Sequence, residues 1–278
     1  MLKIVVCIKQ VPMVSELPWD CKTRTLKRDL APGMMDPGSR RALEAALQIK
    51  ENLAASIFAI TMGPPMAQEI LHQAIALGAD KGILLTDPKM AGADTFLTSH
   101  ILAVCIQTKC PDVDLILCGV QTSDSETGQV GPQLAEQLDL PSIGSVNQID
   151  ITDNTLTAER YADGFCETLQ TTLPALLTID LCAFEPRYLP LNGIETAFLN
   201  PDIDILNAQN LGFNNEFNAI TNSPTQIVDV YSPVSAKENT VLKGPVKQIV
   251  DQVFENYGKT ISSAMKKDLQ PADSGNAS

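Results

Sequence analysis

The residues after the apolar run Leu115–Cys118 combine small side chains, hydroxyl groups and the start of a helix, which suits the binding of an anion. Gly119 ends the apolar run, a polar turn follows over 121–126, and helical spacing begins after Gly128. The backbone N–H groups at a helix start have no partner within the helix and lie at the positive end of its dipole. Phosphate can therefore bind there without a Lys or Arg, and small residues let the backbone come close to it.

The cysteines and histidines form no pattern that indicates a catalytic or metal site. The seven cysteines are odd in number and include no CxxC pair, which suits reduced thiols in a cytoplasm. Cys7 and Cys118 lie in apolar, strand-like runs and are expected to be small core residues rather than nucleophiles. His72 and His100 lie apart on predicted helices, so we expect them to have packing roles. We predict no metal ligand and no catalytic side chain.

Length, composition and charge limit the classes of function. With 278 residues, 44% of them hydrophobic, the chain can bury one large core with an extension, or two modest domains. The net charge of −13 argues against nucleic acid or an anionic membrane as a partner, because such binding needs clustered Lys and Arg. No window reaches the roughly 20 apolar residues of a spanning helix, and the first apolar run is too short for a signal peptide. We therefore expect a cytoplasmic protein.

Short apolar runs alternate with segments of helical spacing in the first half of the chain. The strand-like runs are Lys3–Ile8, Ser56–Thr61, Gly82–Thr86 and Leu115–Cys118, and the helical segments are Arg40–Glu51, Gln68–Gly78 and Thr95–Thr108. This alternation predicts an α/β fold with a mainly parallel sheet and helices on both faces. Each run ends in Gly, Pro or helix-capping residues. Because ligands of such sheets bind outside the carboxyl ends of the strands, these loops are expected to form a nucleotide-sized crevice.

The second half has a different pattern of residues, and this change sets the expected domain boundaries. Its β-rich blocks are Val146–Ile151, Thr155–Tyr161, Glu167–Leu173 and Ala175–Ile179, and their Asp-Asn and Asp-Gly turns predict antiparallel hairpins. We assign residues 1–184 to one domain with these additions. Residues 201–262 are weakly periodic apart from the amphipathic segment Pro245–Tyr257, so they are expected to form an arm that wraps a partner. Residues 263–278 are expected to be a disordered tail.

Several ordered motifs over residues 1–257 resemble the beta subunit of electron transfer flavoprotein. The most specific is Ala158–Thr178, AERYADGFCETLQTTLPALLT, with Phe165 as a mild departure from the family pattern. Further matches are CIKQVP near the start, the MGPP turn at Met62–Pro65, ALGAD at Ala76–Asp80, the turn at Gln121–Pro132 and FEPRY at Phe184–Tyr188. The resemblance implies a Rossmann-like, adenine-nucleotide-binding domain and a heterodimer with an alpha subunit.

The resemblance implies one of two cofactors. In simpler relatives the beta site holds AMP, whereas in electron-bifurcating relatives it holds FAD, which takes hydride from NADH and sends its two electrons to different acceptors. The loop Asp87–Ser99, DPKMAGADTFLTS, resembles the bifurcating version, and Gly92 and Ala93 would keep the wall low beside a flavin. Taken alone, the same loop is a capped helix start. We predict FAD, with a flavin dehydrogenase and ferredoxin or flavodoxin as partners, and hydride chemistry that belongs to the flavin.

The cofactor-binding residues that the resemblance implies lie at the ends of predicted strands, in the loops beyond them and at the starts of predicted helices. They are Cys7, Asp36, Pro37, Gly38, Ser39, Met62, Gly63, Asp87, Ala91, Gly92, Ala93, Asp94, Thr95, Gly119, Gln121, Asp124, Ser125, Glu126, Thr127, Gly128, Gln129, Val130, Gly131 and Pro132. Asp124 is expected to hold the turn or a ribose hydroxyl, and Thr127 to reach phosphate. Asp36 and Asp94 have simple helix capping as their alternative role.

Residues 185–200 resemble the family's recognition loop for partner dehydrogenases. Leu191 matches its exposed leucine, and a buried turn residue is the alternative role for this position. Glu195–Phe198 follow where relatives often carry lysines, which leaves the usual acyl-CoA dehydrogenase partner open. Two other functions also stay open. One is a simple electron carrier with structural AMP, and the other is a non-redox nucleotide sensor with no alpha partner.

Overall fold

The computed structural model describes residues 1–13, 19–20, 25–26, 32–228 and 241–268. The chain divides into two compact units, Met1–Val228 and Asp229–Ser278. No helix in the described ranges is long and apolar enough to cross a membrane.

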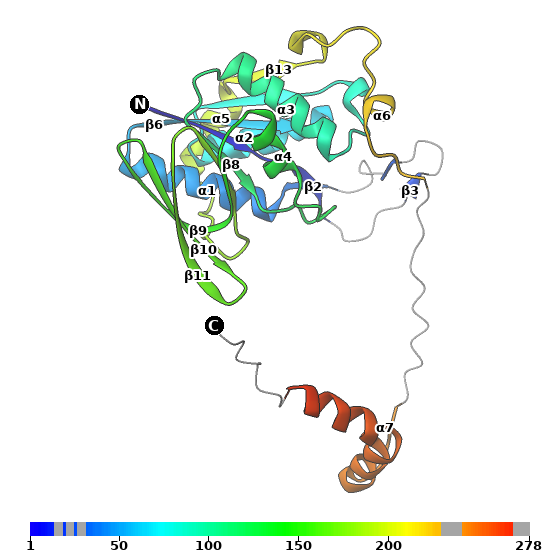
Figure 1. Ribbon diagram of the computed structural model, residues 1–278. Coiled ribbons are helices and arrows are strands. Elements are labelled where there is room, and N and C mark those ends of the chain that lie inside the picture. Colours follow the sequence, from blue (N-terminus) through cyan, green and yellow to red (C-terminus); the bar gives the residue numbers. More distant parts are fainter. Residues whose placement is uncertain (14–18, 21–24, 27–31, 229–240, 269–278) are drawn as a thin grey trace, which may run out of the picture. The chain divides into compact units, whose positions relative to one another are not determined.

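A nine-stranded sheet forms the centre of the first unit (Figure 1). Its strand order is β11-β10-β9-β12-β8-β1-β6-β7-β13. Neighbouring strands run parallel from β9 to β13, and β10 and β11 are antiparallel additions at one edge. The strands are β1 (Leu2–Cys7), β6 (Ala55–Met62), β7 (Lys81–Leu85), β8 (Leu115–Gly119), β9 (Ser142–Thr152), β10 (Thr155–Ala162), β11 (Phe165–Thr172), β12 (Ala175–Ile179) and β13 (Ile203–Leu206). The predicted α/β fold with a mainly parallel sheet is confirmed.

Helices cover both faces of this sheet. Helices α1 (Pro37–Asn52) and α2 (Gln68–Leu77) contribute to one apolar cluster, and α3 (Thr95–Lys109) and α4 (Val130–Gln137) contribute to another. Strand β1 shows the two-sided burial, because Ile4 and Val6 belong to the first cluster and Val5 to the second. This burial on both faces explains why the central strands read as continuous apolar runs.

Shorter elements surround the sheet. Two small antiparallel ladders are formed by β2 (Gln10–Pro12) with β5 (Gly33–Met35), and by β3 (Trp19–Asp20) with β4 (Thr25–Leu26). The short helices are η2 (Pro65–Ala67), η3 (Pro88–Met90), α5 (Leu191–Leu199), η4 (Gln209–Leu211) and α6 (Ala219–Asn222).

Strand β12 corrects one part of the hairpin prediction. We expected Ala175–Ile179 among the antiparallel hairpins, but β12 pairs in parallel with both β8 and β9. Only residues 173–174 separate β11 from β12, and the pairings show that both strands run in the same direction. All five residues of β12 are buried, as is typical of a central parallel strand.

The segment after residue 200 is also organised differently from the expected arm. Ile203–Leu206 forms β13 beside β7, and Leu206, Leu211 and Phe217 are buried in the cluster around α3. Residues 201–228 therefore belong to the first compact unit. The predicted amphipathic segment forms α7 (Val246–Asp268), which runs eleven residues past Tyr257. It includes the first residues of the expected tail, and residues 269–278 lie outside the described ranges.

Candidate functional site

The chain reverses its path across the sheet between β1 and β8. From β1 it passes through α1 to β6 and through α2 to β7, and α3 then leads to β8 on the other side of β1. In open α/β sheets, ligands bind at such a switch point, outside the carboxyl ends of the strands. The loops after β1 and β8 therefore form the candidate site.

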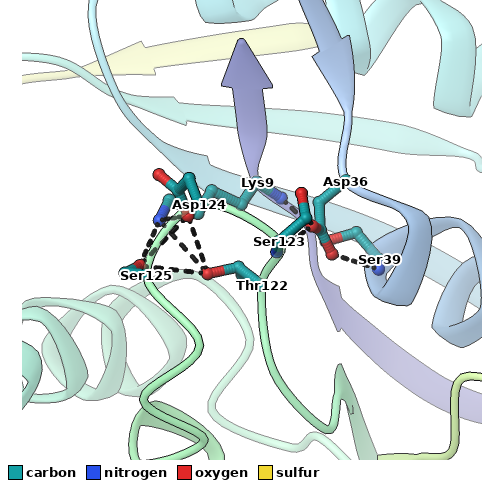
Figure 2. A network of polar contacts seen from close by, with 7 residues as sticks. All are labelled: Lys9, Asp36, Ser39, Thr122, Ser123, Asp124 and Ser125. Carbon is teal, nitrogen blue, oxygen red and sulfur yellow. Dashed lines mark hydrogen bonds and ion pairs between the residues drawn. The ribbon is translucent and has the colours of Figure 1, made fainter. Parts of the chain in front are cut away.

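Asp36 joins the start of α1 to the turn after β8. One carboxylate oxygen accepts a hydrogen bond from Ser39 N at 3.2 Å, which caps the helix. The other oxygen accepts from Ser123 N at 2.8 Å and from Ser123 Oγ at 3.0 Å (Figure 2). Asp36 is almost fully buried, so this carboxylate is a structural link as well as the simple cap that we gave as its alternative role.

Lys9, directly beyond β1, reaches the same turn with its side chain. Its Nζ lies 2.6 Å from Oδ1 of Asp124, 3.2 Å from Oγ of Ser125 and 3.4 Å from Oγ1 of Thr122 (Figure 2). Burial alone would raise the pKa of Asp124, but the ammonium of Lys9 and the two hydroxyls lower that pKa to about 2. Asp124 is therefore a charged anchor of the turn, one of the two roles expected for it.

Two glycines let the backbones of these loops come close. A Cβ atom on Gly119, at the end of β8, would lie 2.7 Å from the carbonyl carbon of Gly38. A Cβ atom on Gly38 would lie 2.8 Å from the carbonyl oxygen of Gln121. Any larger residue at either position would push α1 away from the end of β8.

The start of α4 can hold an anion. Gln129 precedes α4 and makes no side-chain capping bond, so its side chain leaves the first-turn N–H groups of α4 uncapped. By contrast, Asp36 caps α1 and Asp94 caps α3. Val130 and Gly131 carry the first N–H groups, and Pro132 carries none. Gln133 in the same turn has a buried Oε1 without a hydrogen-bond partner among the described residues. This Oε1 has an unused capacity to accept a hydrogen bond, and the first-turn N–H groups of α4 could bind an anion.

The loop between β7 and α3 is fixed by two carboxylates. Asp87 accepts from Lys89 N at 2.9 Å and from Ala208 N, beyond β13, at 3.1 Å. Asp94 caps α3 by accepting from Leu97 N at 2.9 Å, and its other oxygen accepts from Thr225 N at 2.9 Å and Thr225 Oγ1 at 2.7 Å. Burial opposes the charged form of Asp94, but these hydrogen bonds lower its pKa. Asp94 is thus a helix cap that also holds a distant segment.

Gly92 has a local reason to be glycine. Its φ is +81°, and a Cβ atom would lie 2.9 Å from Cγ1 of Ile220 on α6. Left-handed backbone and the approach of Ile220 therefore require a small residue here, without reference to a flavin. Our expectation that Gly92 keeps a wall low beside the ring consequently rests on the family resemblance alone.

The structure brings most of the predicted residues to one edge and links three of their loops. Besides the Asp36–Ser123 contact, Thr95 Oγ1 donates to Gln129 Oε1 at 2.8 Å and joins the start of α3 to that of α4. Glu126 and Gly128 have positive φ in the turn between them. Met62 ends β6 and Gly63 follows it, where Gly63 N donates to Leu85 O, and the hydrogen bonds among described residues do not link these two residues to the other loops. The remaining predicted positions lie in the same loops or at the adjoining ends of strands and helices, and the assignment of these residues to a cofactor stays a prediction.

Cys7 ends β1 and lies opposite Cys118 in the parallel ladder of β1 with β8, and both thiols are free. The hydrogen bond to the Cys118 thiol, together with burial, raises the pKa of Cys7 well above its ordinary value. A protonated thiol in this position is a poor nucleophile, in line with the packing role expected for both cysteines.

Sequence reasoning placed the loops of Lys9, Thr122 and Ser123 at this edge but did not select these three residues as part of the site. A signal for Lys9 was available, because Lys9 lies in the CIKQVP motif at the end of the first predicted strand. Thr122 and Ser123 lie inside a turn whose other members were selected. For Thr225, which binds Asp94 from 131 residues away, no local sequence signal exists.

The segment that leads to Leu191 is fastened to α1. Arg41 Nη1 donates to Ala183 O at 2.6 Å, and the guanidinium of Arg187 binds the carboxylate of Glu44. Leu191 begins α5 with 86% of its surface exposed, so the alternative of a buried turn residue is wrong. Its role in docking stays a prediction.

Comparisons with known proteins give one consistent result. A family model described as the electron transfer flavoprotein domain matches residues 23–200. The chain is 35% identical over 254 residues to an electron transfer flavoprotein subunit beta of Thermoanaerobacterium thermosaccharolyticum, covering 91% of this chain and 97% of that protein. It is 39% identical over 269 residues to the caffeyl-CoA reductase-Etf complex subunit CarD of Acetobacterium woodii, covering 96% and 100%. It is also 32% identical to the acryloyl-CoA reductase electron transfer subunit gamma of Anaerotignum propionicum, covering 91% and 97%.

Proposed function

The chain belongs to the electron transfer flavoprotein family as a beta subunit, and we propose that it binds FAD at the carboxyl edge of its sheet, between β1 and β8. The observation that carries this proposal is the uncapped start of α4 beside the closely packed loops of Asp36 and Asp124. These loops supply N–H groups and small residues at a topological switch point, which is the arrangement that nucleotides use.

Each loop has a task in this proposal. The N–H groups of Val130 and Gly131 would bind phosphate, and the buried Oε1 of Gln133 would accept from an adenosine or ribityl hydroxyl. Asp36 and Lys9 hold the turn that leads to these groups, and Thr95 fixes the neighbouring loop. When bound, FAD supplies the capacity to accept hydride and to release single electrons. The chain's own residues bind and orient it.

The proposed activity is oxidation of NADH in a complex with an alpha subunit. One electron would leave for the FAD of the alpha subunit and a flavin dehydrogenase, and the other for ferredoxin or flavodoxin. The names of two relatives associate them with CoA-ester reductases, which supports a reductase of that class as the partner. Leu191 and the exposed residues of α5 are the proposed docking surface for it.

Helix α7 is the proposed contact with the alpha subunit. Its exposed apolar residues recur at helical spacing and include Val246, Val250, Phe254, Tyr257 and Met265. A 23-residue helix with such a stripe is suited to lie in an apolar groove of another chain. We therefore propose that the part of the expected arm that contacts the alpha subunit is α7, in the second unit.

A count of bound flavins tests the proposal. The alpha and beta subunits are purified together, and FAD and AMP are released and quantified for each heterodimer. Two FAD per heterodimer, with reduction by NADH, is the expected result. One FAD with one AMP would overturn the bifurcating function.

The AMP-binding electron carrier is the second candidate. It is favoured by the finding that the positive φ of Gly92 and the approach of Ile220 account for this glycine without a flavin. It predicts that NADH does not reduce the complex. The family's electron transfer role leaves no observation in favour of the non-redox sensor.

A further inference from the structure

We propose that Lys9 is a positioning residue, which shapes the turn over residues 122–125 for nucleotide binding by holding Asp124, and that Lys9 does not bind phosphate itself. The inference rests on the proposed function, because it takes the edge between β1 and β8 as the nucleotide site. A lysine beside a nucleotide would ordinarily be taken for a phosphate ligand, and the contacts of Lys9 lead to a different assignment.

The ammonium of Lys9 is committed to the turn. A lysine ammonium has three N–H donors. Among the residues that the structure describes, three oxygens lie within hydrogen-bond distance of Nζ, on Thr122, Asp124 and Ser125, and all belong to the turn (Figure 2). A phosphate oxygen would have to displace one of them. The distance to Asp124 Oδ1 is 2.6 Å, so the strongest of these contacts is made with a carboxylate.

Burial shows which partner depends on the other. The side chain of Asp124 is 4% exposed, whereas that of Lys9 is 34% exposed. A carboxylate removed from water needs donors that compensate its charge, and Lys9 supplies a full positive charge. The ammonium therefore compensates the charge of Asp124, to which the hydroxyls of Thr122 and Ser125 also donate.

The backbone of Lys9 gives this ammonium a fixed base. Lys9 N donates to Ser39 Oγ at 3.0 Å, and Asp36 N donates to Lys9 O at 2.9 Å. Asp36 holds Ser123 independently of the lysine side chain. Removal of the ammonium should therefore leave the fold and one attachment of the turn intact, while the end of the turn at Asp124 moves. The uncapped start of α4 follows this turn, so its N–H groups would lose their position.

A double-mutant cycle on nucleotide affinity tests the assignment. The full-length chain, in complex with its alpha subunit and freed of beta-bound nucleotide, is titrated with AMP and with adenosine. Lys9→Met and Asp124→Asn should each weaken AMP binding about tenfold. The double variant should bind AMP no more weakly than the single variant of lower affinity, because both substitutions remove the same interaction. Lys9→Met should weaken adenosine binding by the same factor as AMP binding.

Lys50→Met is the matched control. Lys50 in the last turn of α1 contacts Asp80 at 2.6 Å, the same distance as in the Lys9–Asp124 pair, at the end of the helix opposite Asp36. The AMP affinity of the Lys50→Met variant should equal that of the wild type. Additive losses in the double variant, or a loss confined to AMP, would identify Lys9 as a phosphate ligand and overturn the inference. Unchanged affinity in Lys9→Met, or an equal loss in Lys50→Met, would overturn it too.

The same titration separates this inference from the proposed function. AMP is part of FAD, so the cycle can be interpreted whichever of the two the beta subunit holds. A wild-type complex with one FAD and one AMP would overturn the bifurcating function and leave the cycle valid. A wild-type complex with no beta-bound nucleotide would overturn both before any variant is compared.

Discussion

The guanidinium of Arg187 binds both carboxylate oxygens of Glu44, at 2.8 Å each, although 143 residues separate the two side chains. Glu44 is buried on α1, and Arg187 also reaches Glu51 at 2.7 Å on the same helix. The fork of the guanidinium matches the two oxygens, which makes this a bidentate pair. Helix α1 therefore holds the segment that leads to Leu191 while its first residues hold the turn after β8.

Replacement of Arg187 by Met should destabilise the first unit. The change leaves the buried carboxylate of Glu44 without its half-exposed guanidinium partner, and a buried acceptor that loses its donor costs about 2 kcal/mol in the free energy of unfolding. Urea unfolding followed by circular dichroism measures this loss. Arg40→Met, on the exposed side of the same helix, is the control and should change the free energy by less than about 0.5 kcal/mol. Equal stability of Arg187→Met and wild type would contradict a structural role for the pair.

Acid should destabilise the protein partly through Asp124. The ordinary pKa of this carboxyl is 3.8, and in the folded state its pKa is lowered to about 2. A lowered folded-state pKa stabilises the protein above the unfolded pKa, and that contribution is lost as the pH falls from about 4 to about 2. We expect the free energy of unfolding of Asp124→Asn to fall less over this range than that of the wild type.

The comparison with Asp124→Asn removes the contribution of the other carboxyl groups. Glu44 also has a lowered pKa, because the hydrogen bonds from Arg187 and Gln48 outweigh its burial, and it should contribute with the same sign in both proteins. Parallel pH curves for wild type and Asp124→Asn would show that Asp124 titrates at its ordinary pKa.

Sequence reasoning predicted the fold better than the contacts of the site. Burial on both faces produces continuous apolar runs, so β1, β6, β7 and β8 could be found and their carboxyl ends placed at one edge. The direction of β12 could not be predicted, because the residues of a turn do not determine which neighbouring strand the next strand pairs with.

Pairings between distant residues account for what was missed at the site. Lys9 and Asp124 are 115 residues apart, and a single sequence holds no trace of that contact. The same is true of Gly92 and Ile220, whose approach changes the physical reason for the glycine. Local patterns predict caps and turns correctly, as for Asp36 and Asp94, but leave their second partners unknown.

Replacement of Gly92 by Ala should destabilise the loop before α3 for two separable reasons. The backbone has φ +81°, where an Ala costs about 1 kcal/mol, and the new methyl group would lie 2.9 Å from Ile220. Gly212→Ala is the matched control, because Gly212 has the same φ and no atom within 4 Å of a Cβ. Thermal unfolding should show a larger loss for Gly92→Ala than for Gly212→Ala.

Relief of the contact with Ile220 completes that test. In the double variant Gly92→Ala with Ile220→Ala, the loss should shrink towards the value for Gly212→Ala, since the methyl group then meets no side chain. If the second substitution restores nothing, Ile220 is not the reason for the glycine, and the flavin-wall explanation regains support.

Leu191→Asp should weaken the docking of a partner dehydrogenase while leaving the first unit folded. Leu191 is 86% exposed, so its replacement removes few contacts within the chain and should change the free energy of unfolding by no more than about 0.5 kcal/mol. A charged group in the centre of an apolar contact has to be desolvated, and loss of an anchor residue there typically weakens binding by at least about tenfold. The affinity of the alpha–beta complex for the reductase, measured by surface plasmon resonance, checks this. Leu53→Asp, at the carboxyl end of α1, adds the same charge elsewhere and should bind as wild type. Equal weakening by both variants would mean that charge, and not the position of Leu191, controls the association.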